Sequence, residues 1–238
     1  MKHVATRYIY KVIRRLFFRS RLYGRPAIAA GEPVIMVANH AGSFGPVSVI
    51  TSVPVRMHPW VAHEVTDLRT VAKRIQVEFL EQELHLTPPL SAYLARIIGR
   101  ICVALMKDIG AIPVYSHSRK IASTVQESLR LMEEGKNILV FAEDSKLPLN
   151  EAICEFCTGF IHLAKLYYEK TRKAVHFIPV AVNRKVRGIL VGAPILFDAA
   201  NPFPREKQRL KRELERSVYT LYRELEDATE IKKASGMR

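Results

Sequence analysis

A short apolar segment that ends in Asn-His constrains the fold more than any other part of the chain. The segment Val34–Val37 is apolar and largely β-branched, and it follows a Gly-Glu-Pro sequence. Asn39 and His40 come next, and small residues then lead to Pro46. This pattern predicts a buried strand followed by a turn. Asn39 and His40 would then lie at the carboxyl end of the strand, where α/β sheets bind their ligands.

His40 is a candidate general base at that position. Histidine side chains titrate near neutral pH, which suits them to proton transfer. The alternative is a histidine that only caps the turn and takes part in no chemistry. The residues of this segment leave both interpretations open.

The composition predicts a folded domain with an anionic partner. The chain has 238 residues, of which 48% are hydrophobic and 25% charged, so it has enough apolar side chains for a sizeable core. Its net charge is +14 and its isoelectric point is near 9.9. Such a charge favours a phospholipid surface, a phosphorylated substrate or a nucleic acid. Nucleic acid is the least favoured of these, because the sequence has no helix-turn-helix, zinc finger or basic-aromatic sheet motif.

The cysteines and the hydropathy pattern favour an intracellular setting. Three cysteines do not make a disulfide framework. Cys154 and Cys157 form a Cys-x-x-Cys sequence, which we interpret as two small residues near a helix start, in preference to a zinc ligand pair or a redox pair. We therefore predict no metal site. No apolar run approaches the ~18 residues of a membrane-spanning helix, and we expect no secretory signal.

Residues 1–26 predict a basic amphipathic helix. Eight Lys and Arg residues occur in the first 25 positions, and the first acidic residue is Glu32. Apolar residues recur between them at helical spacing (Tyr8, Ile9, Val12, Ile13, Leu16, Phe17). A helix of this kind binds in the plane of an anionic membrane. The alternative is an ordinary first helix that packs its apolar stripe on the core.

The rest of the chain alternates between strand and helix patterns, which indicates an α/β fold. We predict strands at 34–39, 110–115, 137–142, 176–182 and 186–191, and a further short apolar segment at 60–62. Helices are predicted at 47–55, 66–109 with a break at 87–89, 116–134, 156–171 and 204–231. In the second helical region six residues repeat every three or four positions and predict one apolar face (Leu90, Tyr93, Leu94, Ile97, Ile98, Ile101).

Four stretches, in order, resemble motifs of the glycerolipid acyltransferase family, typified by the bacterial 1-acylglycerol-3-phosphate O-acyltransferases. They are Asn39-His40, the strand Gly110–Val114, the segment Val140–Asp144 and the strand Ile178–Val180. The family has Asn-His-x4-Asp, Gly-x-Ile-x-Val, Phe-Pro-Glu-Gly-Thr-Arg and Val-Pro-Val at these places. The resemblance covers roughly residues 30–195, and four motifs in order at the ends of predicted strands are together fairly specific.

The resemblance implies a fold and an activity. The fold would be one domain, residues 1–238, with a core at 30–195 and a central mixed, largely parallel sheet flanked by helices. The activity would be transfer of a fatty acyl chain from acyl-coenzyme A or acyl carrier protein to a hydroxyl of a lysophospholipid or related lipid. No other cofactor is implied. The protein would work as a peripheral enzyme on the cytoplasmic face of a membrane.

The resemblance also assigns roles to individual residues. His40 would be the general base that takes the proton from the attacking hydroxyl. Glu143 matches the glutamate that the family uses around the acceptor's glycerol phosphate. Lys146 stands where the family has arginine, and it offers a point charge in place of a bidentate fork. The other substrate-binding candidates are Asn39, Ser43 and Arg119.

Three positions depart from the family pattern. Gly45 stands where the family has the aspartate that orients the histidine, and glycine cannot supply a carboxylate. Candidates for the missing carboxylate are Glu64, Asp67 and Asp144, and we favour Asp144, which follows Glu143 at the end of its strand. Ala142 stands where the family has a proline. Ser116 stands where the family has a basic residue, whose role Arg119 or His117 would then take. These departures keep two alternatives open: a catalytically impaired relative that binds lipid or acyl chains, and a glycolipid or carotenoid-type acceptor.

Overall fold

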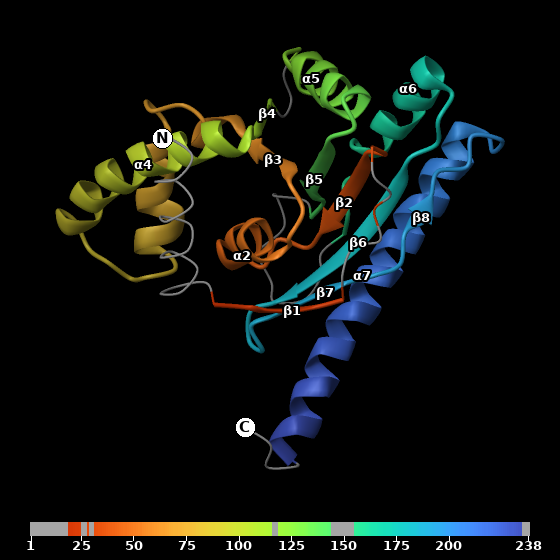
Figure 1. Cartoon of the computed structure of the whole chain (residues 1–238). Helices are drawn as coiled ribbons and strands as arrows, with labels where there is room; N and C mark the ends of the chain where they lie inside the picture. Colours follow the sequence, from red (N-terminus) through yellow and green to blue (C-terminus); the bar gives the residue numbers. More distant parts are fainter. Residues whose placement is uncertain (1–18, 25–27, 29–30, 116–118, 144–154, 235–238) are drawn as a thin grey trace. The chain divides into compact units, whose positions relative to one another are not determined.

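The computed structural model describes residues 19–24, 28, 31–115, 119–143 and 155–234 (Figure 1). The described residues fall into two compact units. One contains those of His58–Ser128, and the other contains those up to Met57 together with those from Leu129 onward. We call the first the helical unit and the second the sheet unit. No helix in the described part of the chain combines the length and the apolar character needed to cross a membrane.

The sheet unit is built on a mixed sheet with the strand order β1-β7-β6-β2-β5, and β8 also pairs with β6. Parallel pairs join β1 to β7 and β2 to both β6 and β5, whereas β6 pairs antiparallel with β7 and β8. The strands are β1 (Arg21–Tyr23), β2 (Val34–Ala38), β5 (Asn137–Phe141), β6 (His176–Asn183), β7 (Gly188–Val191) and β8 (Ile195–Leu196).

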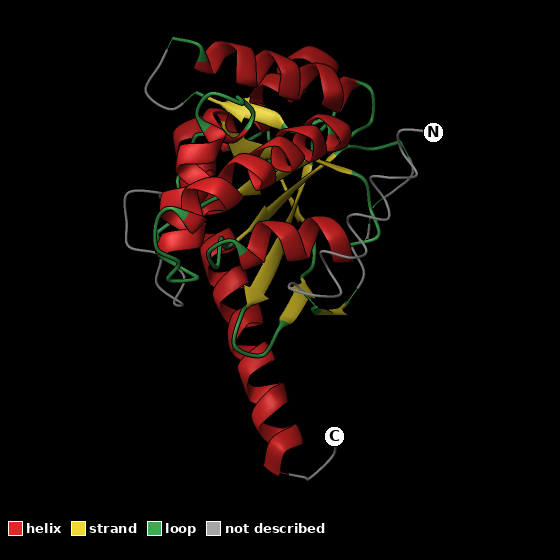
Figure 2. Ribbon diagram, turned by 90° about the vertical axis from the view of Figure 1, so that its left-hand side faces the viewer, coloured by secondary structure: helices red, strands yellow, loops and turns green. Residues whose placement is uncertain are grey.

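Strand β2 is buried along its whole length because helices cover both faces of the sheet. Val34, Met36 and Ala38 pack with helix α2 (Phe44–Ser52) in one cluster. The opposite face is covered by helix α7 (Phe203–Ala234), which packs on β6 and β7 and also contacts α6 (Ile161–Thr171). The later turns of α7 extend past the strands (Figure 2). Coverage on both faces explains why β2 is a continuous apolar run with no polar alternation.

The helical unit contains a parallel pair of strands and a group of helices. Strand β3 (Met57–Ala62) pairs with β4 (Ile112–Val114). The helices are the short η1 (His63–Val65), α3 (Val71–Arg74), the π-helical η2 (Ile75–Glu81), α4 (Leu90–Ile109) and α5 (Ile121–Glu133), of which α5 runs across the boundary into the sheet unit. Helix α4 ends at Gly110, whose φ of +65° favours glycine.

The structure confirms most of the predicted elements and corrects one element type and several boundaries. Residues 21–23, expected to end the first helix, form strand β1, because the Arg21 N–H donates to the Arg187 carbonyl (2.8 Å) and the strand pairs with β7. Helix α2 begins at Phe44, before Pro46, since proline is tolerated in a first helical turn. Helix α6 begins at Ile161, because Phe156 instead forms a bridge with Glu143. The predicted basic helix of residues 1–26 falls largely outside the described residues.

A buried glutamate fixes the start of α7. Glu206 has no exposed surface, and its carboxylate accepts hydrogen bonds from the Asp198 N–H (2.9 Å), Asn201 Nδ2 (3.0 Å) and Arg209 Nε (2.9 Å). Arg209 also donates to the Leu196 carbonyl (2.8 Å), which ties α7 to β8. Burial raises the pKa of Glu206, but the hydrogen bonds from Arg209, Asp198 and Asn201 outweigh it and hold that pKa below its usual range.

Glu206→Gln is expected to lower the free energy of unfolding by about 2 kcal/mol at neutral pH, since it replaces the charge-assisted hydrogen bonds of a buried carboxylate by those of a neutral amide. The matched control is Glu213→Gln, because Glu213 pairs with the same arginine but is 45% exposed. That control should cost less than about 1 kcal/mol. Urea unfolding of both variants makes the comparison, and equal effects would contradict the assigned role.

The effect of Glu206 should also depend on pH. A carboxyl whose pKa is lowered by folding stabilises the protein above its unfolded pKa, about 4.3 for glutamate, and loses that contribution as pH falls through the folded pKa. The difference in unfolding free energy between the wild type and Glu206→Gln should therefore shrink as the pH is lowered below about 4. A difference that stayed constant or grew on acidification would contradict the sign of the shift.

Candidate active site

Asn39 locks the carboxyl end of β2 to β6. Its side chain is 2% exposed. Its Oδ1 accepts a hydrogen bond from the Val182 N–H (2.7 Å), and its Nδ2 donates to the Val182 carbonyl (2.8 Å). The amide thus continues the strand pairing through a side chain, at the point where the main chain of β2 leaves the sheet. Asn39 therefore fixes the position of the main chain that leads into His40. A contact between Asn39 and substrate stays a prediction.

His40 lies directly beyond β2 and is half-buried. Its main-chain N–H donates to Oε2 of Glu143 (2.7 Å). Its ring, whose Nδ1 atom is buried, meets the ring of Phe141 edge to face, with centroids 5.5 Å apart. Because β2 and β5 are parallel neighbours, their carboxyl ends bring His40 and Glu143 together.

Glu143 is held in place from several sides. The strand pairing continues past β5 through the Ala142 N–H, which donates to the Ala38 carbonyl (3.1 Å). On the other side Glu143 forms a bridge with Phe156, whose N–H donates to Oε1 of Glu215 on α7 (2.9 Å). The Glu143 carboxylate is therefore a fixed acceptor for the His40 main chain, a role that the sequence motif did not indicate.

The turn after His40 explains the glycine at position 45. Ala41 and Gly42 both have positive φ, and helix α2 starts two residues later. A Cβ built on Gly45 would lie 2.0 Å from the carbonyl oxygen of His40 and 2.8 Å from its carbonyl carbon. Real Cβ atoms do not approach main-chain atoms this closely. The first turn of α2 therefore packs on the His40 main chain, and no side chain fits at position 45 unless this turn moves.

The structure describes only some of the other predicted site residues. Ser43 is half-buried and directly precedes α2. Arg119 is exposed at the turn before α5, in the helical unit. Asp144 and Lys146 lie outside the described residues, as does Cys154. Cys157 is exposed, and its N–H donates to the Ala142 carbonyl (2.8 Å).

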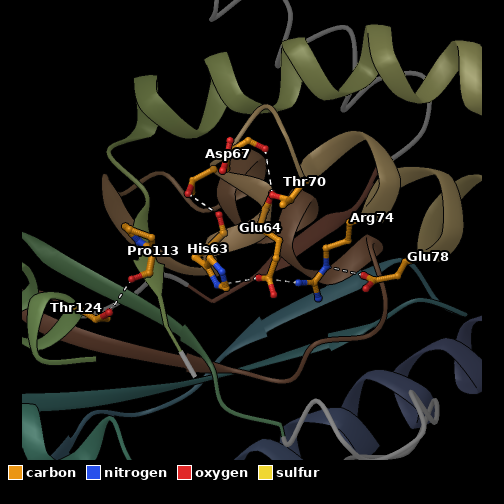
Figure 3. A network of polar contacts seen from close by, with 9 residues as sticks. His63, Glu64, Asp67, Thr70, Arg74, Glu78, Pro113 and Thr124 are labelled. Carbon is orange, nitrogen blue, oxygen red and sulfur yellow. Dashed lines mark hydrogen bonds and ion pairs between the residues drawn. The ribbon is translucent and has the colours of Figure 1, made fainter. Parts of the chain in front are cut away.

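Glu64 and Asp67 have partners within the helical unit (Figure 3). Glu64 lies between the ring of His63 and the guanidinium of Arg74, at 3.1 and 3.2 Å. Arg74 also pairs with Glu78 (2.9 Å). Oδ1 of Asp67 accepts the Arg69 N–H (2.9 Å), which is a local turn contact. These contacts account for both carboxylates without any role beside His40. Within the described residues no group of three His, Cys, Asp or Glu side chains is arranged to hold a metal ion.

Gly45→Ala is expected to lower the free energy of unfolding by about 3 kcal/mol, because its Cβ meets main-chain atoms that cannot rotate away. Gly159→Ala is the matched control, since a Cβ at Gly159 would meet nothing within 4 Å. The control should change stability by less than about 0.5 kcal/mol. Thermal and urea unfolding make the measurement. A Gly45→Ala variant with wild-type stability would show that position 45 does have room for a side chain.

Comparisons with known proteins support the fold. The crystal structure of the 1-acyl-sn-glycerophosphate (LPA) acyltransferase PlsC from Thermotoga maritima matches this chain with a TM-score of 0.56. The match covers 96% of this chain and 83% of that one, at 13% sequence identity. No protein-family model and no curated protein sequence matches the chain. The predicted class is thus confirmed: the chain has a mixed, mostly parallel sheet flanked by helices, in a fold similar to that of this acyltransferase.

Proposed function

We propose that the protein transfers an acyl chain from a thioester to a hydroxyl group of a lipid, with His40 as the general base. The observation that carries this proposal is the position of His40. It lies at the carboxyl end of a central strand, and its main chain is fixed by the Asn39–Val182 pair and by Glu143. The fold shared with an acyltransferase supports the same reaction class.

In the proposed reaction His40 takes up one proton and later returns it. His40 takes the proton of the acceptor hydroxyl while the hydroxyl oxygen attacks the thioester carbonyl carbon. The tetrahedral intermediate then collapses, the carbon–sulfur bond breaks, and the imidazolium returns the proton to the departing thiolate. Because Nδ1 of His40 is buried, we assign this proton transfer to Nε2.

We further propose Asp144 as the carboxylate that orients His40. Position 45 has no room for a side chain, and Glu64 and Asp67 are engaged in the helical unit. Asp144 directly follows Glu143, whose carboxylate contacts the His40 main chain. Glu143 itself acts as a positioning residue, because it binds the His40 N–H.

The substrate assignments follow from the resemblance to the acyltransferase family and from the positive charges of Lys146 and Arg119. We propose a lysophospholipid or related acceptor, with Lys146 and Arg119 as phosphate ligands and Ser43 as a further substrate contact. A glycolipid or carotenoid-type acceptor is the alternative within this reaction class, since Ser116 replaces the family's basic residue. The donor is acyl-coenzyme A or acyl carrier protein. We propose a peripheral enzyme on the cytoplasmic face of a membrane, with residues 1–18, which precede strand β1, as a basic membrane-binding segment.

A second candidate function is supported by Gly45. A turn that closes on the His40 main chain leaves no place for the family's aspartate, so a lipid- or acyl-chain-binding protein without turnover fits the same residues. The two candidates differ in what removal of the His40 ring does. It abolishes turnover in the enzyme and leaves ligand binding intact in the binding protein.

His40→Ala is expected to reduce acceptor-dependent release of thiol from acyl-coenzyme A or acyl carrier protein by at least about 100-fold, as loss of a general base does. The assay uses a panel of lysophospholipids and glycolipids and detects the free thiol. His162→Ala is the matched control, because His162 is an exposed histidine of α6. Tight acyl-chain binding with no acceptor-dependent release in the wild type would favour the binding protein.

Asp144→Asn is expected to lower turnover by about 100- to 10,000-fold with little change in donor affinity, because the amide fails to orient and stabilise the imidazolium. Asp67→Asn is the matched control and should keep wild-type turnover. If Asp144→Asn left turnover unchanged while His40→Ala abolished it, Asp144 would not be the orienting carboxylate.

A further inference from the structure

Exposed large hydrophobic side chains gather on one segment of the helical unit. Ten such side chains occur among the described residues, and seven of them lie between positions 68 and 101. They are Leu68, Val77, Leu84, Leu90, Tyr93, Ile97 and Ile101. Single exposed apolar residues are common on protein surfaces, but this degree of concentration marks an interaction surface.

Over its first three turns helix α4 buries small residues, whereas Val103 and Leu105 are its buried large apolar residues. Ser91, Ala95 and Gly99 are buried, and a Cβ on Gly99 would lie 3.1 Å from Cγ1 of Val71 on α3. Helix α4 therefore approaches α3 closely through small residues. Leu90, Tyr93, Ile97 and Ile101, by contrast, are between 41% and 63% exposed.

The predicted single apolar face of α4 is thus divided, with Leu94 and Ile98 half-buried. The four exposed residues occupy positions 90, 93, 97 and 101 and so form one stripe along the helix. At 1.5 Å per residue this stripe is roughly 17 Å long. A helix that only packed on its own core would place these large side chains inward, so the outward stripe indicates a surface with an external partner.

Basic side chains line one edge of the stripe. At 100° per residue, Arg96, Arg100 and Lys107 fall on one side of the four apolar residues. No acidic residue occurs between Glu83 and Asp108. Within the described part of the chain neither Arg96 nor Arg100 has an ion pair, and both line a surface groove together with Leu68 and Gly99. The surface therefore combines apolar side chains with uncompensated positive charge.

We propose that this face of α4 lies in the plane of an anionic lipid bilayer. The apolar stripe would enter the boundary between headgroups and acyl chains, and the arginines would bind lipid phosphates at headgroup level. Arginine suits this position because its aliphatic stem covers apolar surface while the guanidinium remains hydrated. The residues that form this surface are not part of the predicted basic segment at the start of the chain.

A lipid bilayer fits these features better than a second copy of the chain. A single row of four side chains covers less than the roughly 800 Å² per partner that a stable protein interface buries. A chain of net charge +14 also repels a copy of itself, whereas an anionic bilayer attracts it. The proposal rests on the proposed function in one respect, the expected peripheral membrane location, and adds a second surface that would contact the bilayer.

The experiment measures co-sedimentation of the full chain with vesicles of phosphatidylcholine containing 30% phosphatidylglycerol, without substrate. Ile97→Gln/Ile101→Gln removes the stripe, and Arg96→Gln/Arg100→Gln removes its charge. Both pairs are exposed, so folding should be retained, and circular dichroism verifies it. Arg212→Gln/Arg216→Gln is the matched control, because it removes the same charge from two exposed positions on α7.

Each α4 variant should weaken vesicle binding by about tenfold or more, and the α7 control by less than about threefold. Raising the salt concentration should weaken wild-type binding and should affect Arg96→Gln/Arg100→Gln less. Deleting residues 1–18, which leaves strand β1 in place, separates the two surfaces: the remaining binding should still depend on Ile97 and Ile101. Equal losses in the α4 and α7 variants, or wild-type binding in both α4 variants, would overturn the proposal.

Two further results would also overturn it. One is a wild type that fails to bind the anionic vesicles. The other is a wild-type dimer that Ile97→Gln/Ile101→Gln dissociates without a change in vesicle binding, since a second copy would then cover the stripe. Because no substrate is present, failure of vesicle binding is distinct from failure of the His40 chemistry. That chemistry is tested separately by thiol release with a detergent-dispersed acceptor.

Discussion

The paired hydrogen bonds between Asn39 and Val182 hold the arrangement on which the candidate site depends. A strand that leaves a sheet loses the main-chain partners that fixed its position. Here one buried side-chain amide supplies both a donor and an acceptor to β6 at that point. The main chain therefore reaches His40 in a defined position, and the His40 N–H donates to Glu143, which follows β5. Two parallel neighbours of β2 thus determine where one histidine lies.

The close approach of Gly45 to His40 shows that a departure from a family pattern can be structural. From the sequence alone, the lack of an aspartate at position 45 suggests that a catalytic residue is missing. The distance from a Gly45 Cβ to the His40 carbonyl oxygen, 2.0 Å, shows that the turn has closed over the space that a side chain would need. Restoring the aspartate alone would therefore disturb the main chain of the residue it was meant to assist. A carboxylate for His40 has to come from another part of the chain.

Much of the fold could be predicted because local patterns and tertiary structure agree. The apolar run of β2 predicts a buried strand, and every residue of β2 is buried, with α2 packed on one face. The alternation of strands and helices indicated the class. Residues 21–23 could not be assigned in this way, since their strand exists only through pairing with β7, more than 160 residues away in the chain.

The candidate site was predictable in its residue types but not in its contacts. The Asn-His sequence was predicted to follow a buried strand, and it directly follows β2 in the structure. The Asn39–Val182 bonds join positions 143 residues apart, and no local pattern indicates them. Nor does periodicity reveal which side of α4 is buried, because its large apolar residues flank the small ones that pack on α3. The helical spacing was right, but tertiary packing buries Ser91, Ala95 and Gly99 and leaves four large apolar residues of the predicted face exposed.

The central claim is that the acceptor and the thioester meet at His40, beyond the carboxyl end of β2. The most direct measurement is a crystal structure of the wild-type protein with a non-cleavable ketone analogue of acyl-coenzyme A, in which a methylene group replaces the thioester sulfur. We predict that the ketone carbon lies within about 4 Å of Nε2 of His40, with room for one hydroxyl between them. An analogue bound with its ketone away from His40 would contradict the claim.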